Sequence, residues 1–124
     1  MLIKLMKPVK RYPDFVGIGC QNCGTTWISA CIAQHPDIYF APQKEGSFFD
    51  MRFDKGWDWY LQQFSGADSQ HLCGEWSPGY ICNENALTQS LKHLKNTRIM
   101  SVFRNPVDRL YSHYLRYRAQ GATP

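Results

Sequence analysis

The sequence lacks the features that mark several classes of protein. No run of apolar residues approaches the length of about 18 that a membrane-spanning helix requires. Residues 1–8, in which Lys alternates with apolar side chains, are too short for the apolar core of a secretory signal. The 14 Lys and Arg against 10 Asp and Glu leave a net charge of only +4, which favours an anionic ligand but is too weak to indicate nucleic acid. We therefore expect neither a membrane nor a nucleic acid as partner.

Disulfide-framework spacing is also absent. The five Cys are an odd number without regular spacing, which predicts reduced thiols and a cytoplasmic location. Internal repeats, low-complexity tracts and Pro/Gly/Ser linkers are missing, while a charged fraction of only 19% and four Trp exclude a disordered chain. We expect one domain over residues 1–124, with an N-terminal tail of about residues 1–12.

Strand and helix signals alternate along the chain. The expected strands are residues 14–19, 38–41, 72–76 and 98–103, and the expected helices are residues 25–34, 57–64, 84–95 and a last one from Pro106 onward. This order predicts an α/β fold, a parallel sheet with helices on both faces. The loops after the strands would then meet at one edge, where such proteins bind ligands. These loops are residues 19–24, 42–47, 76–79 and 104–105.

Apolar residues at helical spacing indicate which helix faces are buried. We expect the core to include Cys31, the aromatic group around Trp57, Trp59 and Tyr60, and the Leu triplet of residues 87, 91 and 94. A sugar-stacking role for the aromatic group is the less favoured reading. The last helix carries an apolar stripe of Val107, Leu110, Tyr111, Tyr114 and Leu115.

The first loop has the composition of a phosphate cradle. Gly24 lets the backbone approach a ligand, and the free N–H groups of Thr25, Thr26 and Trp27 can converge on an anion at the positive end of the helix dipole. Thr-Thr in place of Lys-Ser or Lys-Thr distinguishes the loop from a Walker A motif. The alternative is an ordinary glycine turn with a Thr N-cap.

A second motif favours the phosphate cradle over the ordinary glycine turn. Residues 103–114, F-R-N-P-V-D-R-L-Y-S-H-Y, run from a strand end into a helix. Together with G-T-T-W at residues 24–27, this pattern resembles the sulfotransferase family that uses 3′-phosphoadenosine 5′-phosphosulfate (PAPS). Three more segments resemble the carbohydrate sulfotransferases, especially the heparan sulfate group: K-E-G-S-F-F-D (44–50), K-G-W-D-W-Y-L-Q-Q-F (55–64) and G-E-W-S-P-G-Y (74–80). The five segments occur in the family's order and cover Asp14 to about Tyr117.

The resemblance implies a P-loop-like sulfotransferase fold and a role for each motif. Arg104 and Ser112 would hold the 3′-phosphate, since a guanidinium presents a planar fork to two phosphate oxygens. Glu45 would be the catalytic base, partly desolvated by nearby aromatic residues, namely Phe48, Phe49 and Trp76. Arg109 and Arg116 share a helix face with Ser112, and for Arg116 we favour a solvated position. The 5′-phosphosulfate would be held by Asn22, Cys23, Gly24, Thr25, Thr26 and Trp27.

Three positions depart from the family's pattern. Asn22 stands where the family has the Lys that assists the leaving oxygen, Ser47 stands in place of a His, and Trp76 in place of a second Lys. Asn22 would therefore act at the catalytic centre without a charge, at a cost on the order of 10²–10³ in rate. Lys44, Arg11 or a partner chain would supply the missing positive charge.

The resemblance predicts a PAPS-dependent sulfotransferase that acts on a hydroxyl or amine of a carbohydrate-like acceptor, releases 3′-phosphoadenosine 5′-phosphate (PAP) and needs no metal. Family domains are longer, so we expect a truncated member, completed by a second copy as a homo-oligomer. One alternative is a catalytically impaired PAPS- or PAP-binding relative. Another is a thiol-redox domain that uses Cys20 and Cys23, where the helix N-terminus would lower the pKa of the first thiol. A zinc site on these cysteines is less favoured, because no further ligands lie at tight spacing.

Overall fold

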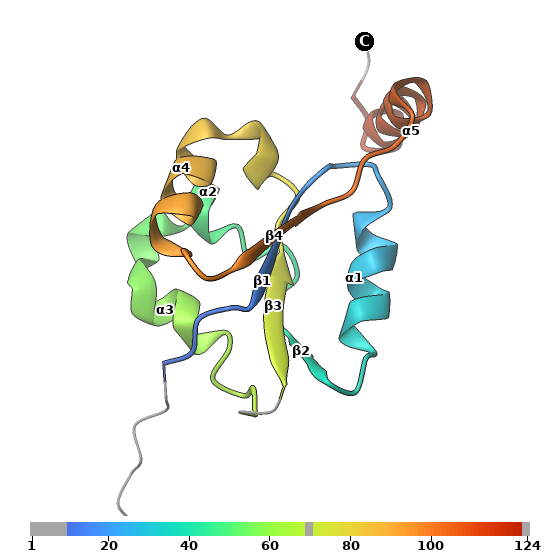
Figure 1. The fold of residues 1–124 in the computed structure, drawn as a ribbon. Coiled ribbons are helices and arrows are strands. Elements are labelled where there is room, and N and C mark those ends of the chain that lie inside the picture. Colours follow the sequence, from blue (N-terminus) through green and yellow to red (C-terminus); the bar gives the residue numbers. More distant parts are fainter. Residues whose placement is uncertain (1–9, 69–70, 123–124) are drawn as a thin grey trace, which may run out of the picture.

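A computed structural model describes residues 10–68 and 71–122, and the expected N-terminal tail lies mostly outside these ranges. The fold centres on a four-stranded sheet in the order β2-β3-β1-β4, in which every pairing is parallel (Figure 1). The strands are β1 (Phe15–Gly19), β2 (Ile38–Phe40), β3 (Leu72–Trp76) and β4 (Arg98–Ser101). The α-helices are α1 (Thr25–Ala33), α2 (Phe48–Met51), α3 (Gly56–Gln62), α4 (Glu84–His93) and α5 (Pro106–Ala119). The predicted α/β fold is thus confirmed.

The direction of each crossover decides which face its helix covers. The chain leaves β1, the second strand from one edge, and reaches β2 at the other edge through α1. The later crossovers, through α2 and α3 and then through α4, run in the opposite direction across the sheet. Right-handed connections place helices of opposite travel on opposite faces. Figure 1 shows this result, with α1 on one side of the sheet and α2, α3 and α4 on the other.

The two faces of the sheet bury different side chains. Val16 and Cys73 point toward α2, α3 and α4 and join a core that includes Phe48, Tyr60 and Phe64. Gly17 on β1 and its pairing partner Trp76 on β3 lie on the opposite face, toward α1. There the Trp76 ring covers Gly17, and a Cβ on Gly17 would lie 2.0 Å from the ring. The aromatic-rich residues that follow β2 therefore build one half of the domain, and glycines make room for large rings in the other.

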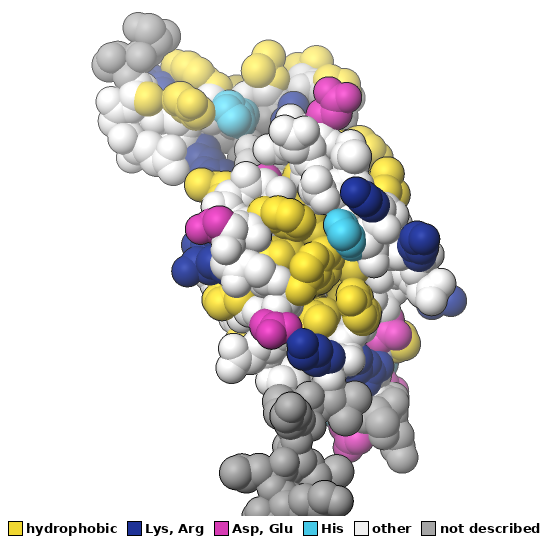
Figure 2. Space-filling view, turned by 90° about the vertical axis from the view of Figure 1, so that its left-hand side faces the viewer, with side chains coloured by type: hydrophobic (Ala, Val, Ile, Leu, Met, Phe, Trp, Pro, Cys, Tyr) yellow, Lys and Arg dark blue, Asp and Glu magenta, His cyan; other side chains and the backbone are white. Residues whose placement is uncertain are grey.

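The aromatic group predicted for the core is there. Tyr60 is buried, while Trp57 and Trp59 pack against the core cluster and stay partly exposed. Figure 2 views the side of α3 and α4 and shows hydrophobic side chains gathered between basic and acidic ones. On this side the Trp57 ring contacts Phe53 and His93, with centroid distances of 6.3 and 4.9 Å.

Two packing predictions are wrong, and one helix was not predicted. Cys31 is exposed rather than in the core, because the residues that α1 buries are Thr25 and Ser29. Leu91 is 63% exposed, because α4 turns Ala86 and Ser90 inward and its C-cap residue Leu94 completes that buried row. The short helix α2 was not predicted, since four residues are too few to show helical periodicity.

Helix α5 turns its polar face, and not its apolar stripe, toward the rest of the domain. Its apolar stripe faces solvent, with Val107, Leu110 and Tyr111 between 63% and 74% exposed. Its polar face approaches the loop that follows β1, where Arg109 donates to the carbonyl oxygen of Gln21 at 3.0 Å. Among the described residues, no helix is long and apolar enough to cross a membrane.

Candidate functional site

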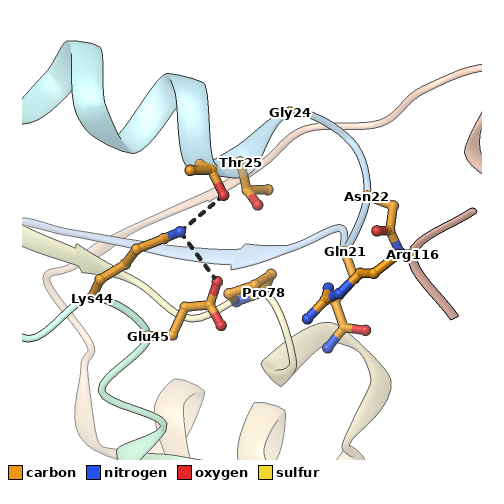
Figure 3. A pocket seen from close by; sticks show the side chains of 9 residues that line it. Gln21, Asn22, Gly24, Thr25, Lys44, Glu45, Pro78 and Arg116 are labelled. Atoms are coloured by element: carbon orange, nitrogen blue, oxygen red, sulfur yellow. Dashed lines mark hydrogen bonds and ion pairs between the residues drawn. The ribbon is translucent and has the colours of Figure 1, made fainter. Parts of the chain in front are cut away.

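A pocket of about 320 Å³ opens at the carboxyl edge of the sheet. Three of the four loops that the sequence placed at this edge contribute to it: residues 21–22 and 24–26 after β1, Lys44 and Glu45 after β2, and Pro78 after β3. The fourth contribution comes from Arg116 on α5 instead of from the loop at residues 104–105. Figure 3 shows Lys44 and Glu45 on one side of this pocket and Arg116 on the other. We call it the loop pocket.

The N-terminus of α1 forms one wall of the loop pocket. Gly24 is its N-cap, with φ 85°, and no side chain caps the helix. This overturns the alternative of a Thr N-cap, because neither Thr25 nor Thr26 bonds back to the first turn. This left-handed conformation favours glycine. Space is not the reason for the glycine, because a Cβ at this position would meet no other atom within 4 Å. The first N–H groups of the helix and its dipole are therefore available to an anion.

Lys44 is the cation next to this helix end. Its Nζ donates to Thr26 Oγ1 at 2.9 Å and lies 3.8 Å from the Glu45 carboxylate (Figure 3). Arg11, the other cation suggested as a replacement, is far from the pocket. It pairs with Asp14 at 2.9 Å, just before β1 and thus at the other end of that strand. Positive charge in the loop pocket comes from Lys44 and Arg116.

The prediction that Phe48, Phe49 and Trp76 shield Glu45 from water is wrong. Its side chain is 47% exposed, and the residues expected to shield it are buried elsewhere. Phe48 and Phe49 belong to the core cluster, and the Trp76 ring lies against Gly17 on the face toward α1. The carboxylate of Glu45 nevertheless lines the pocket beside Lys44, within reach of a molecule bound there.

Asn22 is held by a residue that the sequence analysis gave no role. Its amide nitrogen lies 2.7 Å from Nδ1 of His113 on α5, in hydrogen-bonding contact. Asn22 has φ 61°, a left-handed conformation that Asn tolerates better than most residues. The only sequence signal for this contact is that His113 follows Ser112 on the polar side of α5. Loop and helix thus hold each other through Asn22–His113 and through Arg109.

The structure does not bring the residues predicted for the two phosphate groups of the donor into one pocket. Arg104 is exposed and lines a second pocket of about 350 Å³, together with Cys20, Cys23 and Arg109. Ser112 is partly buried and lines neither pocket. Trp27 is 72% exposed and also lines neither pocket.

The first thiol at this loop, that of Cys20, does not have the lowered pKa that a redox pair needs. Burial raises the pKa of Cys20, and the neighbouring Cys23 raises it further, against a smaller opposite effect of Arg109. The prediction that the helix N-terminus lowers this pKa is therefore wrong. Within residues 10–68 and 71–122, no group of three or more His, Cys, Asp or Glu side chains is placed to bind a metal ion.

Glu75 is the charged residue that the sequence analysis missed. It is 3% exposed and accepts hydrogen bonds from Ser77 at 2.7 Å, Tyr80 at 3.0 Å and Tyr60 at 3.1 Å. Burial raises the pKa of its carboxyl group, and these three hydrogen bonds partly oppose that rise. Its only signal in the sequence was its place in the G-E-W-S-P-G-Y segment.

Comparisons with known proteins identify the family. The model of the sulfotransferase domain matches residues 12–124. The chain belongs to the sulfotransferase domain family. A sulfotransferase from Alicyclobacillus acidocaldarius superposes with a TM-score of 0.80 at 26% identity, over 91% of this chain and 53% of that one.

Two relatives in this sulfotransferase family show its range. The membrane-associated sulfotransferase kil1 of Dictyostelium discoideum is 33% identical over 105 residues, which are 82% of this chain and 22% of that protein. The bifunctional heparan sulfate N-deacetylase/N-sulfotransferase 1 of Mus musculus is 31% identical over 121 residues, 91% of this chain and 14% of that protein. The chain thus spans about a fifth or less of these relatives' lengths.

Proposed function

We propose that this sulfotransferase domain transfers the sulfuryl group of PAPS to a hydroxyl or amine of a carbohydrate-like acceptor and releases PAP. The observation that carries the proposal is the loop pocket, where the uncapped N-terminus of α1 and two cations, Lys44 and Arg116, face the carboxylate of Glu45. A site with this charge distribution suits an anionic donor next to a group that can accept a proton.

The donor's phosphosulfate would lie against the first turn of α1. Residues 22–27 would hold it through backbone N–H groups and the Thr25 and Thr26 hydroxyls, while Lys44 and Arg116 offset its charge. The 3′-phosphate would lie across the loop, where the exposed Arg104 lines the second pocket. Ser112 would join it from α5.

The reaction needs the acceptor in line with sulfur and a base for its proton. In this proposal the acceptor oxygen or nitrogen bonds to sulfur as the bond from sulfur to the bridging phosphate oxygen breaks. Glu45 takes the acceptor's proton, and the electron pair of the broken bond stays on the 5′-phosphate of PAP. Because Glu45 is only half shielded from water, the acceptor itself would complete its desolvation.

Lys44 and Arg116 would compensate for the neutral Asn22. Lys44 reaches the helix N-terminus through its bond to Thr26, so its charge lies close to the oxygens that become more negative during transfer. The glycan acceptor is inferred from the relative named as a heparan sulfate N-sulfotransferase, together with the three carbohydrate-type segments of this sequence.

Transfer from sulfur-labelled PAPS to a panel of glycan acceptors tests the proposal. The parent should label at least one acceptor, and Glu45→Gln should lose most of the rate, since a general base contributes about 10²–10⁴. Glu84→Gln is the matched control, because Glu84 is an exposed carboxylate in the first turn of α4 and lines no part of the loop pocket.

Binding of PAP separates the alternatives. PAP at about 100 times its dissociation constant should stabilise the fold by roughly 2.7 kcal/mol, which thermal denaturation detects. Stabilisation without transfer to any acceptor would identify a catalytically impaired nucleotide-binding relative. No stabilisation at millimolar PAP, with Arg104→Ala indistinguishable from the parent, would refute the nucleotide site.

A further inference from the structure

Glu75 is a buried carboxylate that no step of the proposed reaction uses. It ends the row of β3 side chains that point toward α2 and α3, and three hydroxyl groups donate to it. An ionised carboxylate only accepts hydrogen bonds. All three hydroxyl protons are therefore directed to Glu75, which leaves the oxygen lone pairs of these hydroxyls free for other donors.

Two of these hydroxyls use their lone pairs on the segment that follows Glu45. The backbone N–H of Ser47 donates to Ser77 Oγ at 3.1 Å, and the N–H of Phe48 donates to the Tyr80 hydroxyl at 2.9 Å. Each contact forms a relay from a backbone N–H through a hydroxyl to Glu75. The third hydroxyl, that of Tyr60, donates to the same carboxylate and, among the described residues, makes no hydrogen bond to this segment.

The segment needs such support because its backbone is strained. Glu45 has φ 52° and Ser47 has φ 50°, a region that costs non-glycine residues about 1–2 kcal/mol each. Ser47 is also the N-cap of α2, and its own side chain makes no capping bond. The N–H groups at the start of α2 are satisfied by Ser77 and Tyr80 instead.

We propose that Glu75 is a positioning residue, which fixes where Lys44 and Glu45 stand in the loop pocket by ordering two hydroxyl relays to the segment between Glu45 and Phe49. The proposal rests on the proposed function for its effect on catalysis, while the relays themselves can be tested without nucleotide. Glu75 would act indirectly, because its side chain is buried and does not line the loop pocket.

The titratable groups that face Glu75 are Asp50, Tyr60 and Tyr80. Asp50 favours the protonated form of Glu75 by charge repulsion, and the tyrosine hydroxyls favour the ionised form by donating to it. Burial, and after it the Glu75 carboxylate, raise the pKa of both tyrosines, so they remain donors. The ionised form carries no proton of its own and accepts hydrogen bonds more strongly than the protonated form, so protonation of Glu75 should weaken the relays.

Three variants each remove one of the hydroxyl groups that donate to Glu75. Ser77→Ala removes the relay to Ser47, and Tyr80→Phe removes the relay to Phe48. Tyr60→Phe is the matched control, since it removes a bond of similar length to the same carboxylate and leaves both relays intact. A net hydrogen bond contributes about 0.5–1.5 kcal/mol, which corresponds to an effect of roughly 2–10-fold on a local equilibrium.

Amide hydrogen exchange is the first measurement. Ser77→Ala should speed exchange at Ser47 by about 2–10-fold, Tyr80→Phe should do so at Phe48, and Tyr60→Phe should do neither. Exchange at Ser47 and Phe48 that stays at the parent's rate in the two relay variants, or that rises equally in Tyr60→Phe, would overturn the proposal. Glu75→Gln should speed exchange at both positions, and the other variants decide the matter if this one does not fold.

Steady-state kinetics is the second measurement. Both relay variants should lower kcat for sulfuryl transfer by about the same factor as their exchange effect, with the Tyr60→Phe rate unchanged. Rates in the relay variants equal to those of Tyr60→Phe would overturn the positioning role. If the parent binds no PAP, the proposed function fails and the positioning role fails with it, whereas parental binding with unchanged variant rates removes the positioning role alone.

Discussion

Replacing Lys44 with Ala should weaken PAP binding by removing the cation closest to the N-terminus of α1. The Nζ atom lies 2.9 Å from Thr26 Oγ1, so a phosphate oxygen at the helix end would come within about 4 Å of it. At that distance two unit charges attract by about 1 kcal/mol in water and about 4 kcal/mol near a protein surface. Because the Lys44 side chain is 49% exposed, we expect the lower end, roughly 1–2 kcal/mol after solvent screening.

This energy corresponds to a loss in PAP affinity of about 5–30-fold, which isothermal titration calorimetry measures directly. The difference should shrink as salt rises from about 0.02 to 0.5 M, because counterions screen a half-exposed charge. Lys55→Ala is the matched control, since this Lys lies over the Trp59 ring at 5.7 Å and lines no part of the loop pocket. Equal affinities of the parent and Lys44→Ala at low salt, or an equal loss in the control, would refute the reasoning.

Three further predictions concern stability and assembly. Burial raises the folded-state pKa of Glu75, so the folded state favours the protonated carboxyl. The stability that this preference contributes is present below the ordinary pKa of Glu and is lost as pH rises through the raised pKa. Urea titrations should therefore show the parent losing stability relative to Glu75→Gln as pH rises from about 4 to 8, and a constant difference would contradict this. Gly17→Ala should cost about 1–3 kcal/mol because its Cβ would overlap the Trp76 ring. Gly46→Ala, which meets no atom closer than 3.9 Å, should stay near the parent in thermal denaturation, and equal melting temperatures for both would refute the packing argument. If a second copy covers the exposed α5 stripe, light scattering should show a dimer that Leu110→Lys dissociates, and a monomeric parent excludes it.

The order of the elements could be predicted because each signal is local. The apolar run before Gly19, the Pro at the start of α5 and the Gly24 loop each depend on residues within one or two turns of each other. The α/β alternation follows from these signals, and the common edge of the loops follows from the handedness of crossovers. The ordered motifs then indicated the family, which the sulfotransferase domain model matches over residues 12–124.

The side of each helix that is buried could not be read in the same way. The spacing of apolar residues on α5 marks a stripe, but the hydrogen bonds of Arg109 and His113 to the loop after β1 turn the polar side inward. In α4 the small residues Ala86 and Ser90 face the core, because close packing rewards a matching shape as well as apolar character.

The sequence by itself determined that this chain is an α/β sulfotransferase-family domain, and it predicted that the glycine loop before the first helix binds an anion. Only the tertiary structure decided which charges meet at that loop. It brought Lys44 and Arg116 into the loop pocket, kept Arg11 at the other end of β1, and buried Glu75 behind the strained segment. The reason is physical: local patterns set backbone conformation within a few residues, whereas burial and charge proximity depend on segments that are distant in the chain.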